Sequence, residues 1–294
     1  MQAVIAAEYR TTRLPRTVLS SLRRGTGDPC FRVEGSTVWL TGLAPEPFTA
    51  RLEPGVTGAF WGPGAQWAAE CLPQWLGADD DPTGFACDHP LVAAQWRKYE
   101  PIWRVPRTLL TWQIALAAVL EQRVTGVEAR TAWRRLVREH GEPAPGPREM
   151  YVPPTPEQLL AVPSWDWRRY EVDRQRVVTV RELARCMHVL ERAEALPPGE
   201  GREALRVLPG VGVWTAAEIS ARAFGDADSV SFGDYHLARN VTYALTGRED
   251  GTDEDMAALL KPYSGHRHRV VRMIELAGVA PQRRGPRMRL PGPR

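Results

Sequence analysis

Cysteine is scarce in this sequence. The 294 residues contain four cysteines, Cys30, Cys71, Cys87 and Cys186, and no two of them form a C-x-x-C pair. Neither a zinc site nor a framework of disulfide bonds is therefore indicated. A reduced, cytosolic protein is the simplest interpretation of this cysteine usage.

Long hydrophobic runs are also missing. The most apolar run, from Ile114 to Leu120, ends at Glu121 and is much shorter than the roughly 18 residues that a membrane span needs. Residues 1–10 lack the basic segment, apolar core and cleavage site of a signal peptide. We therefore expect no membrane partner.

Positive charge is present but unevenly distributed. The formal net charge is only +3, yet residues 261–294 carry one lysine and eight arginines against a single acid, Glu275. Such a basic tail beside otherwise balanced charge fits a polyanionic partner. A solvated, arginine-rich tail is the alternative, and charge alone does not separate the two.

The length and the hydrophobic pattern indicate two domains. Residues 31–33 and 37–40 are typical of a β-hairpin, and a further strand is expected at 48–52. A helix is expected at 65–75. From residue 89 on the chain is mainly helical, with a buried central helix at 109–122. We therefore predict a mainly α protein, with a small α+β domain at 1–88 and a helical domain with a basic tail at 89–294.

Two helices are predicted around a short glycine-containing turn. A helical run at 202–207 is followed by Leu208-Pro209-Gly210-Val211-Gly212, and a second helix is expected at 213–224. The glycines permit a tight turn with exposed backbone amides. Amides at the start of a helix, aided by its dipole, favour a phosphate. This hairpin therefore suits sequence-independent contact with a nucleic-acid backbone, although close packing of two helices would also explain the glycines.

One aspartate follows this hairpin at the start of another helix. Leu237, Val241 and Leu245 recur at four-residue spacing, so we expect an amphipathic helix that begins near Asp234. A carboxylate at a helix start is stabilised by the dipole and is commonly a cap. Downstream of a phosphate-binding hairpin, an ionised carboxylate also suits stabilisation of positive charge on a deoxyribose that is losing its base.

The combination resembles a known family. The run from Leu208 to Ala216, followed about twenty residues later by Ser231-Phe232-Gly233-Asp234-Tyr235, is similar to the helix-hairpin-helix (HhH-GPD) DNA glycosylases, most closely the bacterial 3-methyladenine DNA glycosylase II type. The likeness extends over about 200 residues, from Leu120-Glu121-Gln122-Arg123-Val124-Thr125 to Lys261-Pro262-Tyr263. It implies an all-helical glycosylase core behind a small α+β domain.

The resemblance implies roles for particular residues. Asp234 matches the catalytic aspartate, and Trp214 stands where strand-cutting relatives carry a lysine nucleophile, which implies a monofunctional enzyme. The hairpin amides at Gly210, Gly212 and Trp214 would hold a phosphate. Family hairpins also bind a monovalent cation through backbone carbonyls, here those of Arg206, Leu208 and Val211. No cysteine follows Cys186, so no iron–sulfur cluster or other cofactor is expected.

Other positions depart from the family pattern. Gln122 and Arg123 fall where relatives insert a side chain into the gap left by a flipped base, but an arginine replaces the usual apolar wedge, and a charged helix end is the alternative. Trp214 and Tyr235 match pocket aromatics. Glu218 replaces a third aromatic, either in the pocket or as a surface acid, and Arg272 replaces a fourth.

The implied function is monofunctional base excision from DNA. The expected substrate is double-stranded DNA with damaged bases, and the expected products are a free alkylated purine, such as 3-methyladenine or 7-methylguanine, and an abasic site. A neutral lesion (uracil, hypoxanthine or an oxidised purine) is the alternative within this class, and a non-catalytic protein that binds damaged DNA is the alternative outside it. We expect a monomer in the cytoplasm, associated with the nucleoid.

Overall fold

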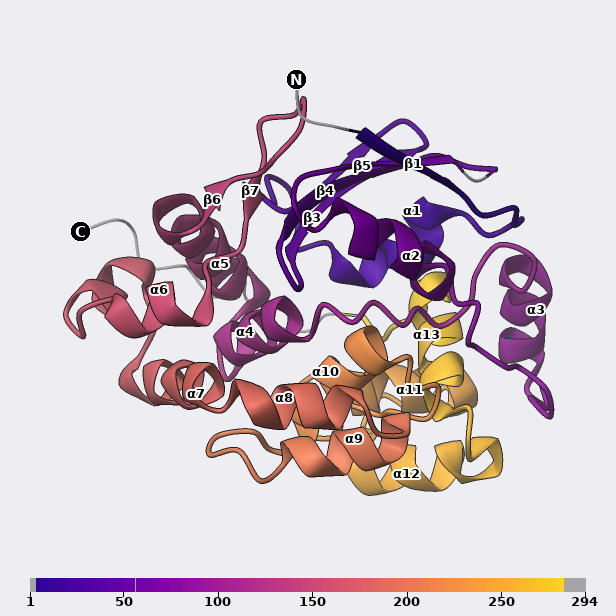
Figure 1. Cartoon of the computed structure of the whole chain (residues 1–294). Helices are drawn as coiled ribbons and strands as arrows, with labels where there is room; N and C mark the ends of the chain where they lie inside the picture. Colours follow the sequence, from indigo (N-terminus) through magenta and orange to yellow (C-terminus); the bar gives the residue numbers. More distant parts are fainter. Residues whose placement is uncertain (1–3, 56, 283–294) are drawn as a thin grey trace.

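The computed structural model describes residues 4–55 and 57–282, and it places a small sheet above a body of helices (Figure 1). The predicted class, a mainly helical chain with an α+β start, is confirmed. Of the predicted basic tail, Arg267, Arg269 and Arg272 lie on α13 (Arg267–Ala277), and the part from residue 283 on lies outside the described residues.

Five strands form one antiparallel sheet in the order β1-β5-β4-β3-β2. The predicted hairpin is present, because Val33 pairs with Val38 and the chain turns at Gly35, whose φ is +60°. The outer pairing of β1 with β5 was not predicted. The strands are β1 (Val4–Glu8), β2 (Phe31–Glu34), β3 (Thr37–Leu43), β4 (Pro47–Leu52) and β5 (Thr57–Trp61).

One hydrophobic core joins the sheet to the first helices. Helix α2 (Ala65–Trp75) has the predicted bounds and covers the sheet with Leu72 and Trp75. Helix α4 (Thr111–Glu121) is the predicted central helix, and every residue from Thr111 to Leu120 is buried. The predicted domain boundary at residue 88 falls in the loop after α2, and the buried cluster runs across it.

The helical body continues the same core. This region contains a short strand pair and the hairpin between α9 and α10. Two short helices, α1 (Pro15–Val18) and η1 (Leu19–Leu22), lie between β1 and β2. The elements of the helical body are α5 (Gly126–His140), β6 (Glu142–Pro143), β7 (Tyr151–Val152), α6 (Pro156–Ala161), η2 (Asp166–Tyr170), α7 (Arg174–Arg185), α8 (Met187–Glu194), α9 (Pro198–Leu205), α10 (Val213–Ile219) and the π-helix η3 (Ser220–Phe224).

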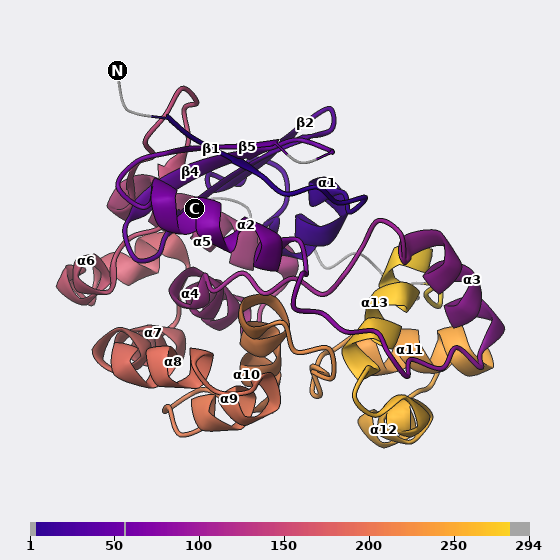
Figure 2. The ribbon, with the colours of Figure 1, turned by 45° about the vertical axis from the view of Figure 1, so that its right-hand side comes forward.

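A second cluster forms from helices far apart in sequence. Helix α3 (Pro90–Tyr99) packs with α11 (Leu237–Thr246), α12 (Asp253–Leu260), η4 (Lys261–Tyr263) and α13, and this group stands apart from α7–α10 in Figure 2. A buried ion pair fastens it to the loop after α2, where Arg269 donates to both carboxylate oxygens of Asp80 at 2.8 Å.

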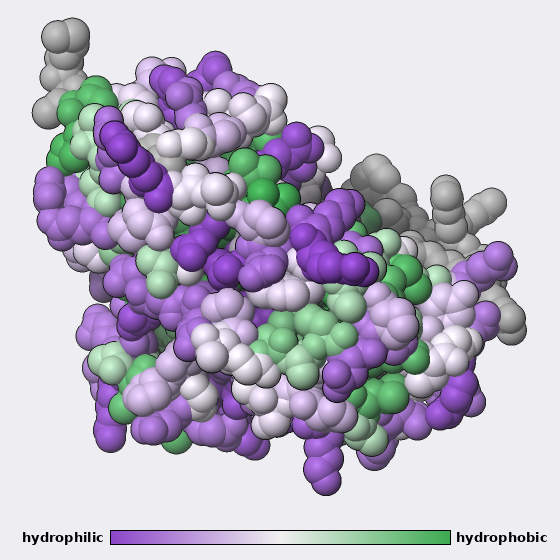
Figure 3. All heavy atoms as spheres, turned by 90° about the vertical axis from the view of Figure 1, so that its right-hand side faces the viewer, coloured by the Kyte–Doolittle hydropathy of each residue, from purple (hydrophilic) through white to green (hydrophobic). Residues whose placement is uncertain are grey.

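The surface is that of a mixed polar protein. Figure 3 shows hydrophilic side chains over most of one face, with hydrophobic side chains gathered near its middle. Among the described residues, no helix combines the length and the apolar character needed to cross a membrane.

Candidate nucleic-acid interface and active site

The turn between α9 and α10 is built by Pro209 and Gly210. The amide of Val211 donates to the carbonyl of Leu208 at 3.0 Å, and Gly210 has φ +83°, so residues 208–211 form a type II turn. Packing imposes the same glycine, because a Cβ at Gly210 would lie 2.0 Å from Oγ1 of Thr179 on α7. Both the backbone and the neighbouring helix therefore require glycine at position 210.

Gly212 is different, because nothing inside the protein requires it. Its backbone (φ −89°, ψ −173°) is accessible to any residue, and a Cβ there would meet no atom within 4 Å. It is the N-cap of α10, and the first hydrogen bond of this helix is donated by Ala216 to Gly212. The start of α10 thus presents amides without helical acceptors to open space.

Gln122 fastens the end of α4 to this hairpin. Its Nε2 donates to the carbonyl of Gly210 at 3.0 Å and to Oγ1 of Thr215 at 2.8 Å. Next to it, Arg123 is exposed and has φ +55°, a conformation that non-glycine residues rarely adopt. Of the two residues predicted to enter a gap in DNA, Gln122 has its side-chain amide hydrogen-bonded to the hairpin, whereas Arg123 is exposed.

Asp234 lies immediately before α11, which begins at Leu237, three residues later than predicted. Its Oδ1 accepts hydrogen bonds from the amides of His236 and Leu237, both at 2.8 Å. Among the described residues, Oδ2 has no hydrogen-bond partner. The carboxylate is therefore held in place by one oxygen and offers the other to a ligand.

The segment just before Asp234 is hydrogen-bonded to two helices, α10 and α12. Ser231 donates to Oε1 of Glu218 on α10 at 2.5 Å, and the amide of Gly233 donates to Asp253 on α12 at 2.7 Å. Gly233 has φ +85°, which allows the chain to turn sharply before Asp234. The bond from Ser231 to Glu218 thus links the segment before Asp234 to α10, the second helix of the hairpin.

Glu218 is neither a free pocket acid nor a solvated one. Its side chain is 15% exposed and pairs with Arg222 at 2.7 Å. Burial by itself would raise the pKa of Glu218, but Arg222 and the hydroxyl of Ser231 outweigh it and hold the pKa below its ordinary value. Glu218 is thus an ionised group whose charge is compensated.

Basic side chains surround this pair. Arg222 also donates to the carbonyl of Ser21 at 3.1 Å, and Arg272 on α13 donates to Oγ of Ser20 at 2.6 Å. His268 lies close by, and its burial, together with Arg222 and Arg272, lowers its pKa to about 4. Arg272, which stands where the family carries a pocket aromatic, connects α13 to η1.

Sequence reasoning missed Arg222 and His268 as members of this cluster, and it quoted Ser231 in the motif without predicting its contact with Glu218. The four-residue spacing from Glu218 to Arg222 on one helix was the available signal for the ion pair. Nothing local indicated Ser231 or His268, because both reach Glu218 from other parts of the chain.

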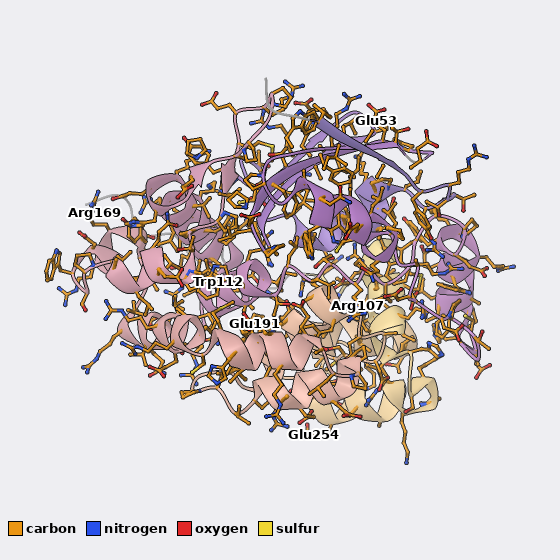
Figure 4. The ribbon with its side chains drawn as sticks, viewed as in Figure 1. Glu53, Arg107, Trp112, Arg169, Glu191 and Glu254 are labelled. Carbon is orange, nitrogen blue, oxygen red and sulfur yellow. The ribbon has the colours of Figure 1, made fainter. Side chains whose placement is uncertain are left out.

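The two predicted pocket aromatics lie in different surroundings. Trp214 is partly buried and packs against the main core. Tyr235 is 84% exposed, and its ring contacts His236 edge-on with centroids 4.7 Å apart. A cavity of about 390 Å³ is lined by Arg107, labelled in Figure 4, and by Pro197 and Phe224, but by none of the predicted site residues.

The predicted cation ligands are backbone carbonyls of the hairpin. The carbonyl of Leu208 accepts the hydrogen bond that closes the turn, whereas those of Arg206 and Val211 accept no backbone hydrogen bond among the described residues. In the same part of the chain, no three His, Cys, Asp or Glu side chains gather where they could hold a metal ion.

Comparison with known proteins places this geometry in context. No family model matches the chain. A probable bifunctional transcriptional activator/DNA repair enzyme AlkA of Mycobacterium tuberculosis is 32% identical over 143 residues. This match spans 47% of the chain but only 28% of the relative. The chain thus matches little more than a quarter of the length of that curated relative.

Solved structures match over nearly the whole chain. A 3-methyladenine DNA glycosylase from Archaeoglobus fulgidus superposes with a TM-score of 0.75 at 16% identity, covering 93% of this chain and 98% of that one. An 8-oxoguanine glycosylase/lyase from Clostridium acetobutylicum gives 0.69 at 11% identity, covering 94% and 99%. The chain therefore has the fold of the helix-hairpin-helix DNA glycosylases and, in sequence, resembles the 3-methyladenine DNA glycosylase II type among them.

Proposed function

We propose that this protein is a DNA glycosylase of base excision repair that releases alkylated purines, such as 3-methyladenine and 7-methylguanine, and leaves an abasic site. The observation that carries the proposal is Asp234. Its Oδ1 is fixed by two amides, its Oδ2 has no partner among the described residues, and it follows an open helix-hairpin-helix turn.

Binding would begin at the hairpin. The free amides at the start of α10 suit a phosphate oxygen, and the open space over Gly212 lets a DNA backbone approach closely. These contacts hold duplex DNA without reading its sequence. The damaged nucleotide would then leave the stack, and Arg123 is the exposed side chain beside the hairpin that could enter the gap.

Release of the base needs little catalytic assistance when the base is cationic. A purine alkylated at a ring nitrogen is already a good leaving group, and Trp214 or Tyr235 can hold its charged ring by cation–π attraction. As the base departs, positive charge builds on the sugar, and the carboxylate of Asp234 stabilises it. Water then completes the hydrolysis, and the DNA strand stays intact.

The state of Glu218 favours alkylated over neutral bases. A neutral lesion needs a proton on its leaving group, but Glu218 is ionised at neutral pH, because Arg222 and Ser231 hold its pKa low. Oxidised purines remain the competing substrate class, since the fold is shared with an 8-oxoguanine glycosylase/lyase. A non-catalytic DNA-binding role would leave the free oxygen of Asp234 unexplained.

We also propose that the hairpin holds a sodium or potassium ion. Two carbonyls without backbone partners, those of Arg206 and Val211, support this, and Leu208 retains a second lone pair. The ion would stiffen the turn and add positive charge near the phosphate. DNA affinity should fall when NaCl and KCl are replaced by choline chloride at constant ionic strength, and an unchanged affinity would refute the proposal.

Asp234→Asn tests the proposed function. Asparagine keeps the oxygen that caps α11, so folding and DNA binding should be nearly unchanged, whereas base release should fall on the order of a hundredfold or more. Single-turnover release is measured on duplexes containing a methylated purine, hypoxanthine or uracil. If the substrate is chromosomal DNA, the protein acts at the nucleoid.

The matched control is Glu254→Gln, which removes an exposed acid on α12 and is expected to leave base release unchanged (Figure 4). An Asp234→Asn variant that keeps more than about a third of the wild-type rate would show that Asp234 is not catalytic. Faster release of hypoxanthine or uracil than of methylated purines would replace the substrate class but keep the reaction.

A further inference from the structure

Three arginines form a row along one face of α5. Arg130, Arg134 and Arg138 are spaced by four residues, so their side chains leave the helix in one direction. With a rise of 1.5 Å per residue, the row is about 12 Å long. We call these three residues the α5 arginine row.

The loop at residues 25–27 lies against all three of these arginines. Nη1 of Arg134 donates to the carbonyl of Thr26 at 3.3 Å, and Nη2 of Arg138 donates to that of Gly27 at 3.4 Å. Gly25 and Gly27 have positive φ, and a Cβ on Gly25 would lie 2.4 Å from Cδ of Arg130. The loop thus holds the guanidinium groups of Arg134 and Arg138 by one hydrogen bond each, and most of the five donors of each guanidinium remain available.

No acid neutralises the row. None of its three members forms an ion pair with a described residue, although 18 such pairs link other side chains of the described chain. Both acids on α5 are engaged elsewhere, Glu128 in the capping box with Thr125 and Glu139 with Arg169, which lies at the far edge of the molecule in Figure 4. Arg135, on another face of α5, pairs with Glu171 at 3.0 Å.

The row begins at the corner that adjoins the hairpin. Helix α5 starts at Gly126, and a Cβ there would lie 2.7 Å from Nη1 of Arg130, so this guanidinium reaches back to the start of the helix. Gln122, four residues earlier, is bonded to the carbonyl of Gly210 in the hairpin turn. The hairpin, Arg123 and the row are therefore connected along one stretch of the molecule.

We propose that the α5 arginine row is a second phosphate-binding surface, which holds the backbone of duplex DNA beyond the segment bound by the hairpin. The inference rests on the proposed function in that its ligand is DNA. Duplex DNA carries a negative charge about every 1.7 Å of its axis, so a row of this length faces several phosphates. Arginine also suits them, because its planar donors bind phosphate oxygens in pairs.

The test is the salt dependence of binding to an undamaged duplex, which requires no catalysis. Each lost phosphate contact lowers the slope of log K against log salt by about 0.9, so replacing all three arginines with glutamine should reduce the slope by about 2 to 3. The Arg→Lys triple variant keeps the charges and should keep most of the slope. Arg135→Gln, an arginine of the same helix with an acidic partner, is the matched control and should change it little.

The outcomes separate this inference from the proposed function. A slope in the glutamine triple variant equal to that of Arg135→Gln would overturn the second surface, whatever the base-release assay shows. A reduced slope supports it, even where Asp234→Asn leaves base release intact. If the glutamine triple variant does not fold, Arg138→Gln alone, at an exposed position, should reduce the slope by about 0.9, and an unchanged slope would overturn the proposal.

Discussion

Two acids lie near the hairpin, and their surroundings give them different capacities. Asp234 uses one oxygen as a helix cap and leaves the other without a partner among the described residues. Both carboxylate oxygens of Glu218 accept hydrogen bonds, one from Ser231 and one from Arg222. Only Asp234 therefore has a carboxylate oxygen that can contact a ligand without first breaking an ion pair.

The pKa of His268 leads to a specific prediction of how the stability of the fold depends on pH. Burial and the neighbouring Arg222 and Arg272 lower its pKa from 6.5 to about 4, while Glu218 opposes the shift. The unfolded chain therefore binds a proton on this histidine between about pH 6.5 and pH 4, where the folded protein does not. Stability is fully present above this window and is lost as the pH falls through it.

We predict that the free energy of unfolding decreases between pH 7.5 and pH 4.5, with a contribution from His268 on the order of 2 kcal/mol. Urea denaturation of wild type and His268→Gln at several pH values measures it, since glutamine cannot take up the proton. The variant should show the weaker pH dependence. The exposed His236→Gln variant is the control, and equal slopes in wild type and His268→Gln would refute the prediction.

At the scale of elements, the two glycines of the hairpin, Gly210 and Gly212, differ in what requires them. Gly210 is required by the turn and by Thr179, so its replacement should harm the fold. Gly212 has an ordinary backbone conformation and open space around it, so only a bound ligand would exclude a side chain there. This pair of glycines can distinguish a phosphate-binding hairpin from one that merely packs closely.

We predict that Gly212→Ala leaves the unfolding midpoint almost unchanged but weakens binding to every duplex sequence alike, by roughly tenfold, which corresponds to about 1.4 kcal/mol. Gly210→Ala should lower stability by about 1–3 kcal/mol, because it combines a left-handed conformation with a clash. Fluorescence anisotropy and thermal unfolding measure both. Normal duplex binding by Gly212→Ala would contradict the phosphate contact at α10.

The π-helix after α10 also has a positioning role. The single hydroxyl proton of Ser220 is shared between the carbonyl of Pro198, 3.1 Å from Oγ, and Asp226, 2.9 Å from Oγ, and Asp226 pairs with Arg202. These bonds connect η3 to α9. Arg222 of η3 donates both to Glu218 on α10 and to the carbonyl of Ser21 in η1.

At the scale of the whole molecule, the N-terminal unit (the five-stranded sheet with α1, η1, α2 and the loop after α2) is bonded to both groups of helices. Arg222 and Arg272 bond Ser21 and Ser20 of η1, and Arg269 holds Asp80 in a buried pair. The N-terminal unit is therefore hydrogen-bonded to both η3 and α13 and holds them relative to each other. This arrangement gives the small N-terminal unit a part in the geometry of the site.

The entire chain contains only two lysines, Lys98 on α3 and Lys261 in η4, and neither lies in the hairpin. We predict that borohydride treatment during turnover yields no covalent enzyme–DNA adduct, because a Schiff base requires an amine at the sugar. Denaturing electrophoresis after incubation with lesion-containing DNA detects an adduct or a cut strand. Either product, without added base, would refute the monofunctional mechanism.

Local sequence signals predicted much of the framework. The bounds of α2 are those expected, α4 is the buried central helix, and the hairpin turn at 208–212 was placed because proline and glycine have strong conformational preferences. The start of α11 was predicted three residues early, because Asp234 caps the helix from outside its first turn. Sequence also identified Asp234 and Gly212 as candidates, but not which contacts they make.

What the sequence by itself determined are those elements whose stability is decided by neighbouring residues: the central helix, the β2–β3 hairpin, the helix-hairpin-helix turn and the order of the motif. The tertiary structure decided the rest. The bonds from Gln122 to Gly210, from Ser231 to Glu218 and from α13 to η1 join positions that are 13 to more than 200 residues apart. No local periodicity encodes such pairs, because they form only when burial brings distant polar groups together and obliges them to satisfy one another.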